Sequence, residues 1–257
     1  MHRVGDEFTS NGMPFPLFRA PLTTVHGTSN GGRCALCERD CPHLFDIGLN
    51  DYLVQPCRKC HSPVGHRIGW PEEVPGIEKC PRCKTHNRWP ARLPRSFSVC
   101  YDCLRGGRVA ISHEFEDGYA EYGLTVQKLV RVHSGRSARA RGFQTKILKR
   151  YGDGSRSYGA YFPVAALKEL HRTPRYSALQ REYWPFHCGH FMTFLGNWDQ
   201  DDFDRAFDGE GFASFRRWAS WPEMAEDWWD WLEGDTGWSY VHHCETCKSY
   251  RVFVDSD

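Results

Sequence analysis

Four CxxC pairs within seventy residues are the feature that most restricts how this chain can fold. The pairs are Cys34/Cys37, Cys57/Cys60, Cys80/Cys83 and Cys100/Cys103. A CxxC turn points two thiolates at one centre, and two such turns complete the tetrahedron that zinc prefers. In a reducing cytosol, paired cysteines are metal ligands more often than disulfides. The sequence therefore predicts two structural zinc ions held by these eight cysteines, in closed sites that leave no coordination position for catalysis.

The spacing of the pairs leaves open which of them share a zinc ion. The gaps between successive pairs are 19, 19 and 16 residues, and gaps of this length are typical of zinc ribbons. Consecutive pairs can combine, or alternate pairs can combine in a cross-braced arrangement. We expect two consecutive ribbons, because this arrangement needs the fewest chain crossings.

Three further cysteines, Cys188, Cys244 and Cys247, indicate a possible third zinc site that lacks one ligand. The candidate fourth ligands are the neighbouring histidines His187, His190, His242 and His243. His187 is our first choice, although adjacent residues rarely both bind one ion. Cys41 has no CxxC partner, and we interpret it as a buried or surface thiol.

The predicted fold is α+β, with small zinc-ribbon modules and a C-terminal α+β part that ends in a zinc-knuckle β-hairpin. Frequent prolines between the CxxC pairs exclude long helices there. We divide the chain into a tandem zinc-ribbon region (1–110), a basic β/loop insertion (111–160) and the C-terminal region (161–257). The Arg-, Ser- and Gly-rich stretch from Ser134 to Gly159 is predicted to be a mobile loop.

Helices are expected mainly in the C-terminal region, at residues 163–171, 198–207 and 221–233. For the last of these, Ser220 and Glu223 fit a capping box, and Gly234 is placed for the C-terminal cap. Met224, Trp228 and Trp231 then share one helix face. This face is either a stripe packed into the core or a tryptophan ridge that contacts a partner.

The net charge of +1 hides two oppositely charged stretches. Residues 128–156 carry nine Lys or Arg and one acid, whereas residues 199–235 carry twelve Asp or Glu and three Arg. The basic stretch is either a solvated loop or a site for an acidic partner. The acidic stretch is either a solvated helix face or a surface that attracts a basic partner. The candidate partner contacts are Asp201, Asp202, Asp204, Glu226, Asp227 and Asp230.

The motifs of several enzyme classes and of membrane insertion are missing from the sequence. It contains no HExxH, GxSxG, P-loop, dinucleotide fingerprint or zinc-deaminase pattern. It also has no secretory signal and no run of about 18 apolar residues. We therefore expect a cytoplasmic binding protein, not an enzyme, with no membrane partner.

Several blocks of the sequence resemble the CbrC-like family. The most specific blocks are Thr173-Pro174-Arg175-Tyr176, Gln180-Arg181-Glu182-Tyr183-Trp184, His187-Cys188-Gly189 and Phe194-Leu195-Gly196. The closing Cys244-Glu245-Thr246-Cys247 and the opening Pro14-Phe15-Pro16-Leu17-Phe18 are similar too. The resemblance covers roughly the first 60 residues and residues 160–257. The second ribbon and the basic segment between them depart from the short members of that family.

The resemblance implies a bacterial cytosolic protein linked to tolerance of colicin-type toxins, with relatives regarded as immunity proteins. We therefore expect an immunity-type protein that binds and blocks a cognate toxin, such as a nuclease or another basic effector. The alternative is a zinc-ribbon protein that binds nucleic acid through its basic stretch. A neighbouring toxin gene would favour the first hypothesis.

Overall fold

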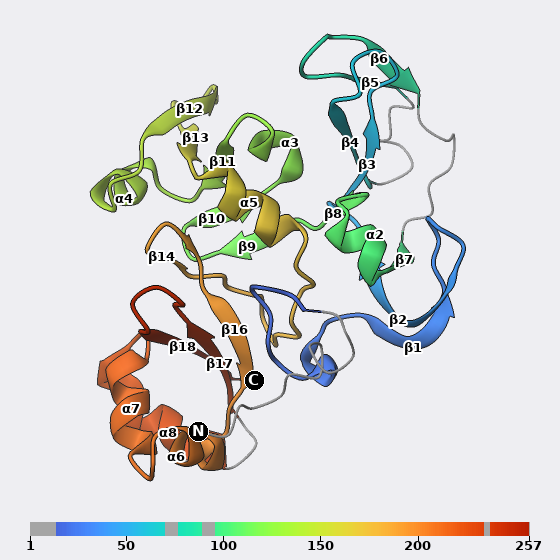
Figure 1. Ribbon diagram of the computed structural model, residues 1–257. Coiled ribbons are helices and arrows are strands. Elements are labelled where there is room, and N and C mark those ends of the chain that lie inside the picture. The colour runs from blue at the N-terminus through green and yellow to red at the C-terminus, as the bar shows by residue number, and fades with distance from the viewer. Residues whose placement is uncertain (1–13, 70–76, 89–95, 234–236, 257) are drawn as a thin grey trace. The chain divides into compact units, whose positions relative to one another are not determined.

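The computed structural model describes residues 14–69, 77–88, 96–233 and 237–256 (Figure 1). It is a mixed α+β structure, as the sequence predicts, built from short helices and several small antiparallel sheets. Among the described residues, no helix combines the length and the hydropathy that a membrane span requires.

The chain divides into two compact units. The cysteine-rich unit comprises Gly27–Pro174, and the C-terminal unit combines Met1–His26 with Arg175–Asp257. The N-terminal segment belongs to the C-terminal unit because Phe18 forms a β-bridge with Phe194, and Val25 forms one with Tyr176. The 3-10 helix η1 (Leu22–Thr24) lies in this segment. The units divide after His26 and after Pro174. The sequence suggested divisions after residues 110 and 160.

Three small sheets carry the CxxC pairs of the cysteine-rich unit. The first, in the order β1-β2-β7, consists of Thr28–Arg33, Asp40–Ile47 and Phe97–Cys100. The second, in the order β4-β3-β8, consists of Pro63–Arg67, Tyr52–Pro56 and Val109–Ala110. The third is the hairpin of β5 (Ile77–Lys79) and β6 (His86–Arg88), and helix α2 (Tyr101–Arg105) follows β7. Pairing of β2 with β7 sets Leu44 opposite Cys100, and so joins segments far apart in sequence.

A five-stranded antiparallel sheet forms the rest of the cysteine-rich unit. Its order is β12-β13-β11-β10-β9, with the strands Thr145–Arg150, Arg156–Tyr161, Leu129–Val132, Gly118–Ala120 and His113–Phe115. The helices are α3 (Tyr122–Thr125), α4 (Gly135–Ala140) and α5 (Val164–His171). Phe162 joins the aromatic core, because its ring meets Phe115 edge-on at 5.3 Å and stacks on Phe143 at 4.3 Å. Helix α5 buries Leu167 and Leu170.

The prediction of a mobile loop from Ser134 to Gly159 is wrong. This stretch forms α4, β12 and most of β13. Ser134 caps α4, because its side chain accepts a hydrogen bond from the Ser137 amide. Phe143 then anchors the connection to β12 by stacking on Phe162. The Arg- and Ser-rich composition reflects exposed side chains on regular structure, not an irregular backbone.

The C-terminal unit packs helices against a three-stranded sheet (Figure 1). The sheet has the order β16-β17-β18, with the strands Thr193–Asn197, Gly237–His243 and Tyr250–Ser256. The other elements are β14 (Phe186–His187), β15 (His190–Phe191), α6 (Gln200–Ala206), α7 (Gly211–Trp218), η2 (Pro222–Met224) and α8 (Ala225–Glu233). The core between helices and sheet contains Trp198, Phe203, Phe215, Val241 and Val252.

The predicted helix at 221–233 exists, but its start and its buried face differ from the prediction. The Ser220 hydroxyl donates to the carbonyl of Val252 and makes no capping box. Trp228 is buried together with Ala225 and Leu232, whereas Met224 and Trp231 are 39% and 37% exposed. The turn of 3-10 helix before α8 moves Met224 out of register with the buried stripe. Gly234, the expected C-terminal cap, lies outside the described residues.

Candidate metal centres and acidic face

The first metal centre joins the two ends of the N-terminal cysteine run. Cys34 and Cys37 lie in the turn after β1, Cys100 ends β7 and Cys103 lies in α2. The sulfurs of Cys34 and Cys103 are 3.7 Å apart, and those of Cys37 and Cys100 are also 3.7 Å apart. A tetrahedral zinc ion with Zn–S bonds of about 2.3 Å separates its sulfurs by about 3.8 Å. These two sulfur pairs are therefore spaced as such an ion requires, and all four sulfurs lie within 4.8 Å of one another.

The four cysteines of the second candidate metal centre lie in the sequence between the two CxxC pairs of the first. Cys57 and Cys83 have sulfurs 3.6 Å apart, as have Cys60 and Cys80. These distances are far longer than the roughly 2.05 Å of a disulfide. The two CxxC turns follow β3 and β5, and each leads into the second strand of a hairpin.

The pairing of the cysteines is nested, so the expected consecutive ribbons are wrong. The outer pairs share one group of four donors and the inner pairs share the other. The cross-braced alternative is excluded by the same grouping. The physical cause is the pairing of β2 with β7, which closes the whole segment between Cys37 and Cys100 as one loop.

A third group contains His187, Cys188, Cys244 and Cys247, the set predicted from the sequence. All four donor atoms lie within 4.8 Å of one another. The Nδ1 atom of His187 is 3.4 Å from the sulfur of Cys188 and 3.4 Å from that of Cys247. Cys188 and Cys247 are exposed and Cys244 is buried, so this centre is more open to solvent than the other two.

The other three histidines lie outside the group of four donors. His190 Nε2 is 2.8 Å from the Thr246 hydroxyl and 3.9 Å from the sulfur of Cys244. His242 is fully buried among aromatic rings, with the Phe194 ring at 5.3 Å. His243 lies 3.5 Å from the Glu245 carboxylate. Of the four candidates, the structure therefore brings only His187 into the group of donors.

A shared backbone pattern supports metal binding at the third centre. In three N-terminal turns, the amide of the residue four positions after the first cysteine donates to that cysteine's carbonyl: Glu38 to Cys34, His61 to Cys57 and Lys84 to Cys80. Lys248 donates to Cys244 in the same way. All four donor residues have positive φ, between 57° and 62°. The C-terminal turn is thus the same knuckle as those that build the first two centres.

Electrostatics at the first centre favour a bound cation. The Arg39 side chain, which donates to Cys37 at 3.5 Å, lowers the pKa of Cys37 to about 6. Burial raises the pKa of Cys103 to about 11, and it raises that of Cys100 further. Four adjacent thiols cannot all ionise without a compensating charge, because like charges at this distance repel strongly. A divalent metal supplies that charge and deprotonates its thiol ligands.

Residues around the metal centres also orient the ligands, and sequence reasoning missed them. Arg39 also forms an ion pair with Asp102 at 2.7 Å. Arg108 donates to the sulfur of Cys103 at 3.4 Å, and Asn87 contacts the sulfur of Cys57 at 3.7 Å. Such contacts tune metal ligands in many proteins. Arg39 follows its knuckle at the fifth position, and this is the only one of these contacts with a local sequence signal. Cys41 lies in β2, half-buried, and belongs to none of the three groups.

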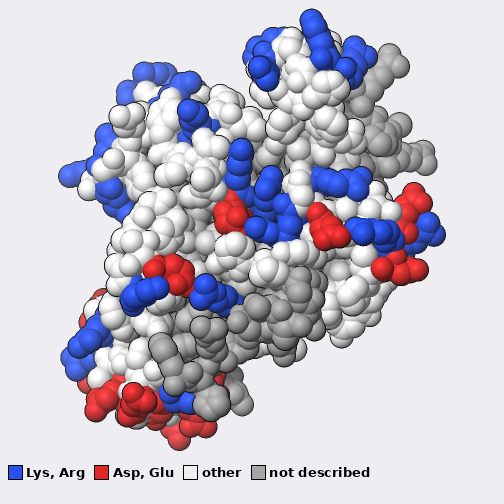
Figure 2. Space-filling view, in the orientation of Figure 1, with Lys and Arg blue, Asp and Glu red and all other residues white. Residues whose placement is uncertain are grey.

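The predicted partner contacts form an acidic face on α6 and α8, but not all of them are free for a partner. Figure 2 shows Asp and Glu gathered over these helices. Asp202 pairs with Arg205 at 2.8 Å, and Asp204 accepts a hydrogen bond from the Gly211 amide at the start of α7. Asp201, Glu226, Asp227 and Asp230 are exposed. Among the described residues, these four carboxylates have no basic partner.

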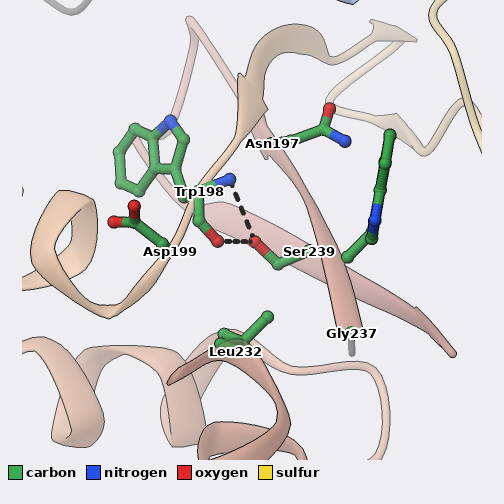
Figure 3. Close-up of a pocket in the computed structure, with 7 residues that line it drawn as sticks. Asn197, Trp198, Asp199, Leu232, Gly237 and Ser239 are labelled. Atoms are coloured by element: carbon green, nitrogen blue, oxygen red, sulfur yellow. Dashed lines mark hydrogen bonds between the residues drawn. The ribbon is translucent and has the colours of Figure 1, made fainter. Parts of the chain in front are cut away.

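Exposed aromatic side chains accompany the acidic face. Trp221, Trp231 and Trp238 are 52%, 37% and 40% exposed. Trp238 lines a cavity of about 220 Å³ together with Trp198, Asp199 and Leu232 among others (Figure 3). Ser239 fixes one wall, because its hydroxyl donates to the Trp198 carbonyl and accepts from the Trp198 amide (Figure 3). Carboxylates and tryptophans beside a recess are typical of protein-binding surfaces.

Sequence comparison places the chain in a family. The model of the Uncharacterised protein family (UPF0167) matches residues 78–256. Because this match covers more than half of the chain, the chain belongs to that family. No curated protein and no solved structure shows a significant match.

Proposed function

We propose that this member of the UPF0167 family is a binding protein stabilised by three structural zinc ions, and that its acidic face captures a basic protein. The observation that carries the metal part is the geometry of the donor groups. There are three sets of four donors, and within each set the donor atoms lie within 4.8 Å of one another. In the first two sets, sulfur–sulfur distances of 3.6–3.7 Å fit a tetrahedral ion. Cysteine and histidine donors favour zinc over magnesium or calcium, which prefer oxygen.

Each zinc ion would serve stability. Four protein ligands leave no open position for water or substrate, so the ions hold segments together without Lewis-acid chemistry. Apparent binding free energies of structural zinc are on the order of 10 kcal/mol. Elemental analysis of purified protein is expected to give three zinc ions per chain, and X-ray absorption is expected to show mainly sulfur ligands. A zinc content below one per chain would contradict the metal part of the proposal.

The charges of α8 support a role in binding a basic partner. Asp230 and Glu233 occupy the last turn of α8, which contains no Lys or Arg. Acidic side chains at a helix C-terminus oppose the helix dipole and reduce stability. Trp221 and Trp231 are 52% and 37% exposed in the same region. Both features suit an interface in which carboxylates speed encounter and central aromatic rings slow dissociation.

We infer that the partner is a bacterial toxin, as the resemblance to CbrC-like proteins implies, and that binding blocks it in the cytoplasm. The test expresses each gene that neighbours this one in a susceptible bacterium, with and without the chain. We expect one product to arrest growth and the chain to restore it. The variant Glu226→Lys/Asp230→Lys is expected to fold, keep its zinc and fail to restore growth. Asp40→Lys/Asp153→Lys, which makes the same change in net charge at two exposed residues of the other unit, is the matched control.

Two results would contradict this proposal. If no neighbouring product is toxic, or if the chain rescues none of them, the toxin role is wrong. If the α8 variant protects as well as the wild type, and binding shows little dependence on salt, then the acidic face is not the binding surface.

The alternative, binding of nucleic acid, is favoured by one observation. Strand β12 lies at the edge of its sheet and exposes Lys146, Lys149 and Arg150. The Lys149 ammonium lies 4.8 Å from the centre of the Tyr151 ring, which is itself exposed. Cations beside an exposed aromatic ring can contact phosphates and stack on bases. Salt-dependent binding of single-stranded RNA or DNA that is lost in Lys149→Glu would support this alternative.

A further inference from the structure

The cysteine-rich unit contains a cavity that none of the metal centres uses. Its volume is about 480 Å³, within the usual range of small-molecule sites. The walls come from β3 and β4, the turn after α2, helix α3 and helix α5. Apolar side chains, including Val54, Val109 and Leu167, form much of the lining. The cavity is thus large enough and apolar enough for the body of an organic molecule.

The charged residues that line this cavity are all basic. They are Lys128, Lys168 and Arg172, and none of the carboxylates that the structure describes lines the cavity. Among the described residues, none of the three cations forms an ion pair. The nearby Glu169 on α5 is already paired with Arg105. The positive potential of the three side chains is therefore not cancelled within the cavity. Figure 2 shows Lys and Arg gathered around α5.

The polar group at the inner wall adds no charge. His171 is 3% exposed, and its Nδ1 donates to the Ile111 carbonyl at 2.6 Å. Its Nε2 is 2.9 Å from the Thr125 hydroxyl, which also lies 3.0 Å from the Tyr122 carbonyl and can donate to only one of the two. Burial lowers the pKa of His171 to about 4, so the ring is uncharged at neutral pH. The inner wall therefore adds no charge, and the cations near the surface dominate the electrostatics of the cavity.

The cationic side is also preformed. Lys168 is exposed on α5, and Arg172, which caps the C-terminal end of this helix four residues later, is half-buried. Arg172 lies over Gly107, where an added Cβ atom would come within 2.9 Å of the guanidinium. Gly107 has a φ of +71°, which suits glycine. The tight turn after α2 therefore leaves room for the Arg172 side chain beside the cavity.

We propose that this cavity binds a small organic anion, with its acidic group at Lys128, Lys168 and Arg172 and its apolar body against Val54, Val109 and Leu167. The three cations attract a carboxylate, sulfonate or phosphate, and the apolar walls favour a ring or an acyl chain over an inorganic ion. The site is independent of the acidic face, which belongs to the other unit.

The test uses two fluorescent probes that share one apolar body, with the zinc-loaded full chain. 8-Anilino-1-naphthalenesulfonate carries a negative charge, and N-phenyl-1-naphthylamine is its neutral counterpart. We expect the anionic probe to bind at one saturable site per chain, more tightly than the neutral probe. Lys168→Glu is expected to weaken the anionic probe at least tenfold and the neutral probe less than twofold. Val126→Trp, at an exposed residue that lines the cavity, is expected to weaken both.

Arg136→Glu is the matched control, because Arg136 is exposed on α4 in the same unit and does not line the cavity. It makes the same change in net charge and is expected to leave both affinities unchanged. The proposal is overturned if Arg136→Glu weakens the anionic probe as much as Lys168→Glu, since the effect is then one of net charge. It is also overturned if Lys168→Glu and Lys128→Glu both bind the anionic probe like the wild type, or if binding does not saturate.

Discussion

The nested pairing of the cysteines makes a prediction that zinc counting can test. In the nested arrangement, Cys34 and Cys100 bind the same ion, so Cys34→Ser/Cys100→Ser is expected to lose one zinc and keep two. Cys34→Ser/Cys57→Ser damages two sites and is expected to keep one. With consecutive ribbons, Cys34→Ser/Cys100→Ser would keep one zinc ion and Cys34→Ser/Cys57→Ser would keep two. With a cross-braced arrangement, each variant would keep one zinc ion. Elemental analysis after dialysis against a weak chelator distinguishes the three.

The structure also gives the relative contribution of the two nested centres to stability. The outer centre joins Cys34 to Cys103, which are 69 positions apart, and the inner centre joins Cys60 to Cys80, which are 20 apart. Treated as cross-links of the unfolded chain, loops of these lengths contribute about 4 and about 3 kcal/mol. The difference is about 1 kcal/mol, and about 0.8 kcal/mol if the inner centre has already formed and shortened the outer loop by its own length.

Loss of the outer centre should therefore destabilise the cysteine-rich unit more than loss of the inner centre. Urea unfolding of Cys34→Ser/Cys100→Ser and of Cys60→Ser/Cys80→Ser, each with its remaining zinc bound, measures this difference. We expect the first variant to have the lower midpoint. A lower urea midpoint for Cys60→Ser/Cys80→Ser would refute the reasoning from nested loops. The counting experiment would refute it if Cys34→Ser/Cys100→Ser kept one zinc ion and Cys34→Ser/Cys57→Ser kept two.

Three further predictions concern other parts of the molecule. Asp230→Lys should raise the unfolding free energy by about 0.3–1 kcal/mol in urea titrations, because it places a cation at the C-terminal end of α8. The same variant should bind the partner less tightly. A loss of stability would contradict this account of α8. Burial lowers the pKa of His171 to about 4, so its contribution to stability is complete above about pH 6.5 and is lost as the pH falls toward 4, by up to about 3 kcal/mol. Comparing the unfolding free energies of wild type and His171→Gln across this range should show a flatter curve for the variant, and parallel curves would refute the assignment. The third metal centre should release zinc to a chromogenic chelator before the other two, because Cys188 and Cys247 are exposed; Cys188→Ser should remove this fast phase alone.

Ligand identity could be predicted from the sequence because a CxxC knuckle is a local structure. Its two sulfurs converge within one turn, and the knuckles at Cys34 and Cys244 share their hydrogen bonds although 210 positions separate them in the sequence. His187 was predictable for a similar reason, since it lies beside Cys188. Which knuckles meet depends instead on the path of the chain between them. Equal gaps of 19 residues carry no information about that path.

The charged stretches show the limit of counting residues along the chain. The basic count over 128–156 suggested a loop, yet side-chain caps and one stacked ring, Phe143 on Phe162, fix this stretch into a helix and strands. The acidic count over 199–235 correctly marked α6 and α8 as acidic. It did not show that Asp204 is engaged within its own unit, since its contact with the Gly211 amide requires the turn between α6 and α7. Asp202 is engaged too, by Arg205 three positions further along the same helix.

The cationic cavity illustrates why some sites need the fold before they can be seen. Lys128 belongs to the basic stretch at 128–156, but Lys168 on α5 and Arg172 at the end of α5 come later in the sequence. The apolar residue Val54 of the cavity wall comes much earlier. No window along the sequence contains these residues together. They meet because β3 and β4 pack beside α3, where an added Cβ on Gly65 would collide with the Tyr122 ring at 2.5 Å. A glycine in a strand thus allows the close approach of the strand to α3, and the cavity lies where these elements meet α5.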